Sequence, residues 1–208
     1  MAHAAVVPSG AGSSRLTGRL LSIQVGRVRP LQVGERKIQS AIGKTHAVES
    51  VAVGVLGLEG DEQADLTVHG GLSKAVYALP AEHLPWWQAQ RQEQGTFLFD
   101  DPLTPGLLGE NLSLQGVSEA DLYIGDVLMF ESVQLRVTQP REPCGKFNAV
   151  MGYSQAGRDM VKSGRSGFYL AVDVPGVLRI GSVFEVLPGP RSIGVVQALQ
   201  HKAGKHLR

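Results

Sequence analysis

Apolar and polar residues alternate over several short stretches of the chain, and such alternation is typical of half-buried β-strands. Residues 19–28 alternate in part, and residues 133–137 alternate cleanly. Residues 46–58 are rich in valine and small residues, which favours one or two strands there. Further strands are predicted at residues 76–79, 124–130, 168–174 and 177–186.

Two stretches have the signals of short helices. Residues 81–94 can form a helix if Pro85 lies in its first turn, where the missing backbone N–H does no harm. Residues 154–163 can form a second helix, with Ser154 as its N-cap and Gly164 as its stop. Both helices are brief in comparison with the predicted strands.

The turn signals indicate the fold class. Glycine and proline separate the predicted strands, and Pro175-Gly176 joins the last two of them in a predicted hairpin. Strands and helices do not alternate along the chain, so a doubly wound sheet is not expected. Many short strands with two brief helices predict a mainly β protein, either a barrel or a sandwich.

Composition and charge narrow the range of functions. The 208 residues suit one domain, and a hydrophobic fraction of 43% allows a sizeable core. The net charge of +1 creates no field that would attract nucleic acid or an anionic membrane, and no apolar run is long enough to cross a bilayer. The single cysteine excludes an intramolecular disulfide and a zinc site of several thiolates, and it fits a reducing cytoplasm.

The chain divides into three predicted parts. Residues 1–17 are rich in alanine, glycine and serine and lack the regions of a signal peptide, so we expect a flexible leader. Residues 18–190 hold all the predicted strands and helices and form the domain. Residues 191–208 are a short, mixed, basic tail, in which we expect one amphipathic turn.

The most informative segment is Gln139-Pro-Arg-Glu-Pro-Cys-Gly-Lys146, which holds the only cysteine. Two prolines stiffen it, and Arg141 and Lys146 place two cations near the thiol. Nearby cations favour thiolate over thiol, which makes Cys144 a candidate soft metal ligand or nucleophile. The alternative is a small buried residue at the end of a strand, because free cysteine is among the most buried residue types.

A second candidate site contains His69, Gly70, Gly71 and Lys74. Adjacent glycines after a strand let backbone amides point at a ligand, and an anion such as phosphate is the natural guest of this kind of nest. His69 and Lys74 flank the two glycines. The alternative is an ordinary turn beside a hydrogen-bonded structural histidine.

Two polar turns complete the set of motifs. Glu110 and Asn111 follow Gly109 and offer hydrogen-bond acceptors and a donor beside a flexible residue. Residues 57–61 have two glycines and two acids, one of them Asp61, which is the composition of a tight turn. Taken alone, both stretches are explained by the local hydrogen bonds of turns.

Five motifs occur in one order along the chain, namely Gly57-Leu-Glu-Gly-Asp61, His69-Gly-Gly71 with Lys74-Ala75, Gly109-Glu-Asn111, Ile124-Gly-Asp126 and Gln139-Pro-Arg-Glu-Pro-Cys144. Together they resemble the MOSC domain, the molybdenum cofactor sulfurase C-terminal domain, over roughly residues 18–188. The resemblance is greatest to small standalone bacterial members of the YiiM type, which act on N-hydroxylated purines. It implies a MOSC-type β-barrel related to the pyruvate kinase barrel domain, with a few short helices.

The resemblance also implies a molybdopterin-type molybdenum cofactor, with Cys144 as the protein ligand to the metal. A thiolate is a soft donor that suits such a centre. Arg141 can make bidentate contacts to phosphate or pterin oxygens, and Lys146 adds positive charge beside the thiolate. The remaining implied contacts are a phosphate cradle of Lys44, His69, Gly70, Gly71 and Lys74, a pterin contact from Asn111, and two orienting carboxylates, Asp61 and Glu110.

The implied activity is a molybdenum-dependent reductase that removes oxygen from an N-hydroxylated base or a related small molecule. His69 is a candidate proton donor, because histidine titrates near neutrality. No Rossmann or flavin motif is visible, so a separate reductase is expected to donate the electrons. Two alternatives stay open, namely a sulfur carrier or transferase with a persulfide on Cys144, and a non-catalytic cofactor-binding module.

The tail departs from the pattern of longer relatives. Those relatives carry a C-terminal helical segment after the barrel, and only Val195-Val-Gln-Ala198 matches its start. Whether this chain has the partner docking or substrate closure of such a segment is therefore left open by the resemblance.

Overall fold

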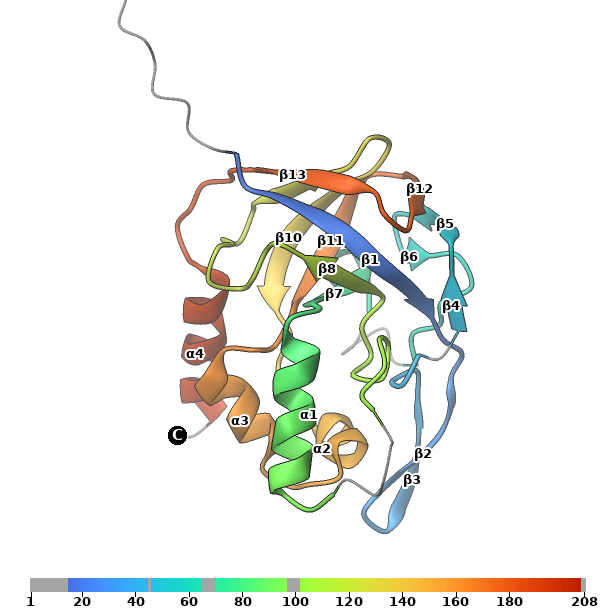
Figure 1. The fold of residues 1–208 in the computed structure, drawn as a ribbon, viewed down its shortest axis with the longest axis vertical. Coiled ribbons are helices and arrows are strands. Elements are labelled where there is room, and N and C mark those ends of the chain that lie inside the picture. Colours follow the sequence, from blue (N-terminus) through green and yellow to red (C-terminus); the bar gives the residue numbers. More distant parts are fainter. Residues whose placement is uncertain (1–14, 45, 65–69, 97–101, 207–208) are drawn as a thin grey trace, which may run out of the picture.

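Seven strands close into a barrel, which confirms the mainly β barrel predicted from the sequence (Figure 1). The computed structural model describes residues 15–44, 46–64, 70–96 and 102–206. Around the barrel the strands follow the order β13-β9-β10-β11-β7-β8-β1, and β1 pairs again with β13. Among the strands of the described residues, only β7 and β8 run parallel to each other. The barrel strands are β1 (Thr17–Val25), β7 (Val76–Pro80), β8 (Leu112–Gln115), β9 (Val127–Met129), β10 (Gln134–Pro140), β11 (Phe168–Val174) and β13 (Val183–Leu187).

Apolar side chains from these strands fill the barrel. The first half of β1 alternates between exposed and buried residues, as its sequence predicts, whereas all five residues of β7 are buried. Gly18 allows the barrel to close, because a Cβ at this position would lie 2.4 Å from the ring of Phe184 on β13. Closure leaves these strands without a free pair of edges, which removes a common route to aggregation.

Smaller sheets extend from the barrel. β4 (His46–Val48) pairs with the end of β1. β5 (Ser50–Gly54) pairs with β6 (Gly57–Leu58) and with β12 (Gly176–Arg179) in a three-stranded sheet. β2 (Arg29–Val33) and β3 (Arg36–Ser40) form a separate hairpin.

The hairpin predicted around Pro175-Gly176 is wrong. β11 pairs with β10 and β7, whereas β12 pairs with β5 and β13 pairs with β9 and β1. The turn signal correctly marked the end of a strand, but the alternation of a strand does not specify its partner. Of the two strands that follow β11, β12 pairs with β5 and β13 closes the barrel against β1.

Four α-helices and one short 3₁₀ helix are described: α1 (His83–Glu93), α2 (Gly145–Met151), α3 (Ala156–Ser163), α4 (Val195–His206) and η1 (Leu72–Lys74). Pro85 lies in the first turn of α1, as predicted. Gly164 ends α3 in the left-handed conformation, also as predicted, but the N-cap is Gln155 and not Ser154. The sequence analysis did not anticipate α2, and the single turn predicted in the tail is the longer helix α4.

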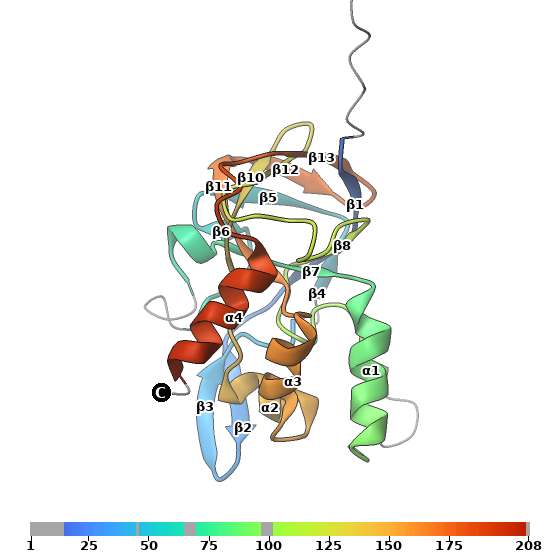
Figure 2. The same cartoon turned by 90° about the vertical axis from the view of Figure 1, so that its left-hand side faces the viewer.

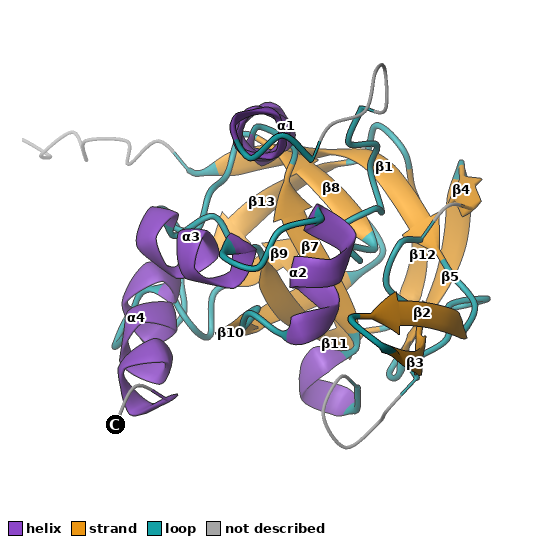
Figure 3. Ribbon diagram, turned by 90° about the horizontal axis from the view of Figure 1, so that it is seen from below, coloured by secondary structure: helices purple, strands orange, loops and turns teal. Residues whose placement is uncertain are grey.

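The helices lie at one end of the barrel, which is the lower end in Figures 1 and 2. A second apolar core fills the space between α1, α2 and α3, and the rings of Trp87 and Phe147 meet edge to face at 5.1 Å within it. Seen from below, α2 lies beneath the barrel strands, with α3 and α4 beside it (Figure 3). None of the described helices is both long and apolar enough to cross a membrane.

Candidate functional site

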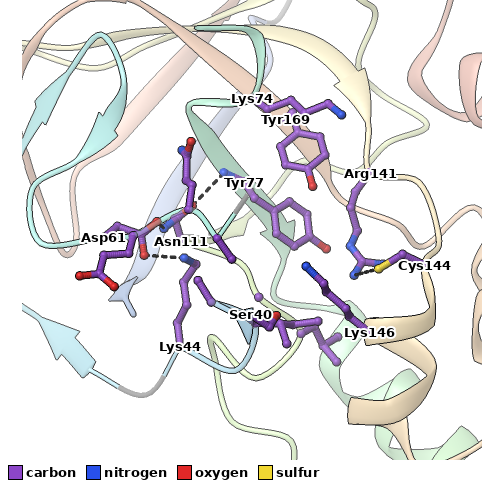
Figure 4. A pocket seen from close by; sticks show the side chains of 17 residues that line it. Ser40, Lys44, Asp61, Lys74, Tyr77, Asn111, Arg141, Cys144, Lys146 and Tyr169 are labelled. Atoms are coloured by element: carbon purple, nitrogen blue, oxygen red, sulfur yellow. Dashed lines mark hydrogen bonds and ion pairs between the residues drawn. The ribbon is translucent and has the colours of Figure 1, made fainter. Parts of the chain in front are cut away.

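A cleft opens at the helical end of the barrel (Figure 4). It is lined by the ends of strands β3, β7 and β11, by the loops around them and by the segment that carries Cys144. Seven of the residues singled out in the sequence line this cleft, namely Lys44, Asp61, Lys74, Asn111, Arg141, Cys144 and Lys146. The barrel therefore brings together motifs that are about 100 residues apart in the chain.

Cys144 lies at the end of the short connection between strand β10 and helix α2. Pro140 ends the strand, and Cys144 has extended backbone angles as the N-cap of α2. Its thiol is free and half-buried. The predicted loop is thus a short connection that positions the sulfur at the cleft, and the interpretation of Cys144 as a fully buried residue does not describe this geometry.

Arg141 is buried beside the thiol. Its guanidinium lies 4.0 Å from the Sγ of Cys144 and 3.5 Å from the Sδ of Met160. It also covers the ring of Phe147, with 4.5 Å between its Cζ and the ring centroid. Among the described residues, no carboxylate forms a direct ion pair with Arg141, although its charge interacts with the buried carboxyl group of Glu110.

Two lysines add to the positive charge. Lys74, on η1, lies 5.6 Å from the ring centroid of Tyr169, and Lys146, in the first turn of α2, points into the cleft (Figure 4). Together with Arg141 they place three cations in the lining of the cleft that also contains the thiol. Such a cluster favours an anion in the cleft.

A buried network forms the opposite wall. The Nζ of Lys44 donates to Oδ1 of Asp61, and the two side chains are only 6% and 4% exposed. Asp61 also accepts hydrogen bonds from the backbone N–H of Gly26 at 2.8 Å and from Nδ2 of Asn111 at 2.9 Å. All charges of this wall are matched, so it is a rigid support for the cleft.

Asn111 ties that wall to the barrel. Its Oδ1 accepts from the backbone N–H of Tyr77 at 3.1 Å, and its Nδ2 donates both to Asp61 and to the carbonyl oxygen of Gln24, the latter at 3.2 Å. Both donors of the amide are used within the protein. The side chain therefore has little capacity for the pterin contact that the sequence analysis expected of it.

Glu110 lies behind the cleft and does not line it. It is fully buried, its Oε1 accepts from the backbone N–H of Gly106 at 2.7 Å, and its Oε2 has no partner among the described residues. Burial raises the pKa of Glu110 from 4.5 to about 7, although Gly106 and Arg141 act in the opposite direction. Glu110 is thus a carboxyl group that changes charge near neutrality inside the protein.

The glycine nest is described only in part. Gly71 has a φ of 82° and caps η1, whereas neither Gly70 nor Gly71 is among the residues that line the cleft. His69 lies outside the described residues, so its expected role as a proton donor stays a prediction. Of this motif, the structure places only Lys74 in the cleft.

Two tyrosines that the sequence analysis did not single out line the same cleft. Tyr77 donates its hydroxyl to the carbonyl oxygen of Ser166 at 2.8 Å, and the hydroxyl of Tyr169 points toward Arg141 (Figure 4). Burial raises the pKa of Tyr77 well above its ordinary value and also raises that of Tyr169. Both hydroxyls keep their protons at neutral pH. Their only signal in the sequence is an aromatic residue at the start of a predicted strand.

Comparisons with known proteins extend the picture. Residues 65–185 match the family model named MOSC domain. The chain is 34% identical to the uncharacterized protein YflK of Bacillus subtilis over 85% of its own length and 76% of that protein, and 34% identical to protein YiiM of Escherichia coli over 81% and 76%. It is 31% identical to a protein named "Reductase" from Gibberella moniliformis, over 83% of this chain and 30% of that protein. The crystal structure of YiiM from Geobacillus stearothermophilus superposes with a TM-score of 0.68 at 27% identity, over 92% of this chain and 86% of that one.

Proposed function

Since the chain belongs to the MOSC domain family, we propose that its cleft binds a molybdenum cofactor of the molybdopterin type and that the protein reduces N-hydroxylated small molecules. The observation that carries the proposal is the half-buried thiol of Cys144 beside the buried guanidinium of Arg141, which has no direct ion pair with a described carboxylate. A buried cation without an ion-pair partner is costly, and an anionic ligand would offset that cost.

The donor set fits a metal that brings most of its own ligands. Within the described residues, no group of three or more His, Cys, Asp or Glu side chains could hold a metal ion. One soft thiolate can still complete the coordination of a metal already bound to sulfur, which is how molybdopterin holds molybdenum. The cleft encloses about 90 Å³, so a pterin would extend beyond the described walls.

Each residue of the cleft then has a defined task. Cys144 would ligate the metal, and Arg141, Lys74 and Lys146 would bind the negatively charged parts of the cofactor. The matched pair of Lys44 and Asp61 would hold the wall in place and leave its own charges unavailable to the ligand. When bound, the cofactor supplies two-electron redox chemistry.

The reaction needs protons as well as electrons. Two electrons and two protons convert an N-hydroxyl compound to its amine and one water, with cleavage of the N–O bond. The hydroxyl of Tyr169, which keeps its proton and lines the cleft, would donate a hydrogen bond to the oxygen that leaves. A separate reductase would deliver the electrons, and the name of the Gibberella moniliformis relative supports redox chemistry of this kind.

Metal and pterin analysis tests the binding half of this proposal. We expect protein produced in a host that makes the cofactor to retain molybdenum, the Cys144→Ala variant to fold but retain none, and Cys144→Ser to bind weakly through its harder oxygen. A molybdenum content in Cys144→Ala equal to that of the wild type would refute the ligand role. For the catalytic half, loaded protein with a reduced viologen dye should reduce an N-hydroxylated purine, and failure to do so would refute the reductase.

A sulfur carrier is the second candidate, because the same half-buried thiol beside a guanidinium is also suited to hold a persulfide. Mass spectrometry of freshly isolated protein distinguishes the two. A peptide containing Cys144 that carries one additional sulfur atom, in protein without molybdenum, would favour sulfur transfer over reduction.

A further inference from the structure

We propose that an apolar pocket on the far side of Cys144 is a second ligand site, which takes a flat, uncharged organic molecule such as a heteroaromatic base. This inference deepens the proposed function and rests on it in one respect, namely that the occupant is the substrate. The cationic cleft would then hold the cofactor, and the apolar pocket would hold the carbon skeleton of the molecule to be reduced.

The pocket lies between the cysteine segment and helices α2, α3 and α4. Its volume is about 750 Å³, within the range of about 300–1,000 Å³ typical of small-molecule sites. Pro143, Val161, Leu199 and Ala203 contribute apolar side chains to its wall. A space of this size and character suits the body of a small organic ligand.

Cys144 connects the two cavities. Among the described residues, Cys144 is the one that lines both the cationic cleft and the apolar pocket. The sulfur is therefore approachable from two sides that differ in chemistry, one cationic and one apolar. A ligand in the pocket would approach the sulfur without passing through the cationic cleft.

The wall formed by α4 is fixed to the cysteine segment. The Nζ of Lys202 contacts Oε1 of Glu142 and, at 2.8 Å, Oε1 of Gln139. On the other side, α3 packs closely on the segment, since a Cβ at Gly157 would lie 2.9 Å from the Cβ of Pro143. The pocket is thus held between two helices that are anchored on either side of the cysteine.

The charges around the pocket select against a cationic occupant. Arg158 and Lys162 on α3 contribute positive charge, and the only acid of the lining, Glu142, is paired with Lys202. An uncharged ring with hydrogen-bond acceptors at its edge fits this environment, because the ring meets the apolar wall and its acceptors meet the two cations.

Alkylation of the single cysteine tests the pocket without any cofactor. In full-length protein made without molybdenum, we would measure the rate constants of Cys144 with N-phenylmaleimide, a flat neutral reagent, and with iodoacetate, a small anion. Both reagents attack the thiolate, so their ratio cancels any change in thiolate content. Ala203→Trp fills the pocket, and Gln197→Trp places the same ring at an exposed position of α4 outside the pocket lining.

We expect Ala203→Trp to lower the ratio of the maleimide rate to the iodoacetate rate about tenfold, equivalent to about 1.4 kcal/mol, and Gln197→Trp to leave it unchanged. Lys146→Ala should raise the ratio about threefold, because the anion loses electrostatic attraction in the cleft. Val161→Trp fills the pocket from α3 and serves if Ala203→Trp does not fold. An unchanged ratio in the folded pocket-filling variants would overturn the proposal. Equal slowing of both reagents would overturn it as well, because the introduced ring would then hinder the sulfur from both sides.

The same variants separate this inference from the proposed function. In loaded enzyme, Ala203→Trp should raise KM for an N-hydroxylated purine while the molybdenum content stays at the wild-type level. A protein with no reductase activity but the expected alkylation ratios would refute the proposed function and leave the pocket. An active enzyme whose KM and ratios do not respond to Ala203→Trp or Val161→Trp would refute the pocket alone.

Discussion

The guanidinium of Arg141 lies 4.0 Å from the sulfur of Cys144, and both groups belong to a segment of four residues between a strand and a helix. The side chain of Arg141 is buried, whereas that of Cys144 is half-buried. A cation fixed in this way is present before any ligand arrives. The site is therefore preorganised for an anion, and four predictions follow from this and from the neighbouring buried charges.

Replacement of Arg141 with methionine should separate stability from ligand binding. Because the guanidinium is buried without a direct ion-pair partner among the described residues, its removal should change the free energy of unfolding of cofactor-free protein by no more than about 1 kcal/mol, and can even raise it. The same variant should lose molybdenum retention. Urea unfolding and metal analysis of the same preparations measure the two effects, and a large loss of stability with normal metal content would contradict the assignment.

The pair of Lys44 and Asp61 should behave in the opposite way. Asp61→Ala leaves a buried ammonium without its partner and should cost about 3–5 kcal/mol in urea unfolding. Asp173→Ala is the matched control, since its ion pair with Arg136 is largely exposed and should contribute only about 0–1 kcal/mol. Similar losses in the two variants would show that burial of the first pair has no energetic consequence.

Glu110 should make stability depend on pH. Its folded-state pKa of about 7 exceeds the ordinary value of 4.5, so the folded protein binds this proton more tightly than the unfolded chain. The contribution is fully present below about pH 4.5 and is lost as the pH rises through 7. Relative to Glu110→Gln, the wild type should lose about 3 kcal/mol between these limits.

Equilibrium unfolding of both proteins at intervals between pH 4.5 and pH 8 checks this prediction. Glu185→Gln, which removes a carboxylate that pairs with the exposed Arg15, serves as the control and should follow the wild type closely. Parallel curves for the wild type and Glu110→Gln would mean that Glu110 has no raised pKa in the folded protein.

Lys202→Ala should loosen α4 without unfolding the barrel. Its ammonium group is partly exposed, so we expect a loss of only about 0–1 kcal/mol in global stability. Amide hydrogens of α4 should nevertheless exchange faster, because the contacts to Glu142 and Gln139 are gone. Gln200→Ala, at an exposed position of the same helix, is the control, and equal exchange in both variants would exclude the anchoring role.

The parts of the site that the sequence predicted are those whose chemistry lies within a few consecutive residues. Cys144, Arg141 and Lys146 line one cleft because a short connection carries all three. Lys44 and Asp61 were predicted only through the resemblance to the family, and their pairing with each other depends on three-dimensional contact. No local signal distinguishes a lysine that binds a ligand from one that is already matched.

The parts that the sequence did not predict depend on the closure of the barrel. Tyr77 and Tyr169 lie directly opposite each other on neighbouring strands. They are 92 residues apart in the sequence, so no local pattern predicts that they are neighbours. The partners of the last strands were wrong for the same reason, since alternation reports which face is buried and not which strand lies alongside. The length of α4 was underestimated because its sequence has only a weak helical pattern, and the helix is stabilised by packing on β10.

The pairing of β13 with β1 has a consequence for the life of the protein in the cell. Strand β1 can pair with β4 and β8 earlier, but the ribosome must synthesise residues 183–187 before β1 can meet β13 and close the barrel. Contacts between such distant parts of a chain form slowly. The barrel therefore cannot close until β13 has been synthesised.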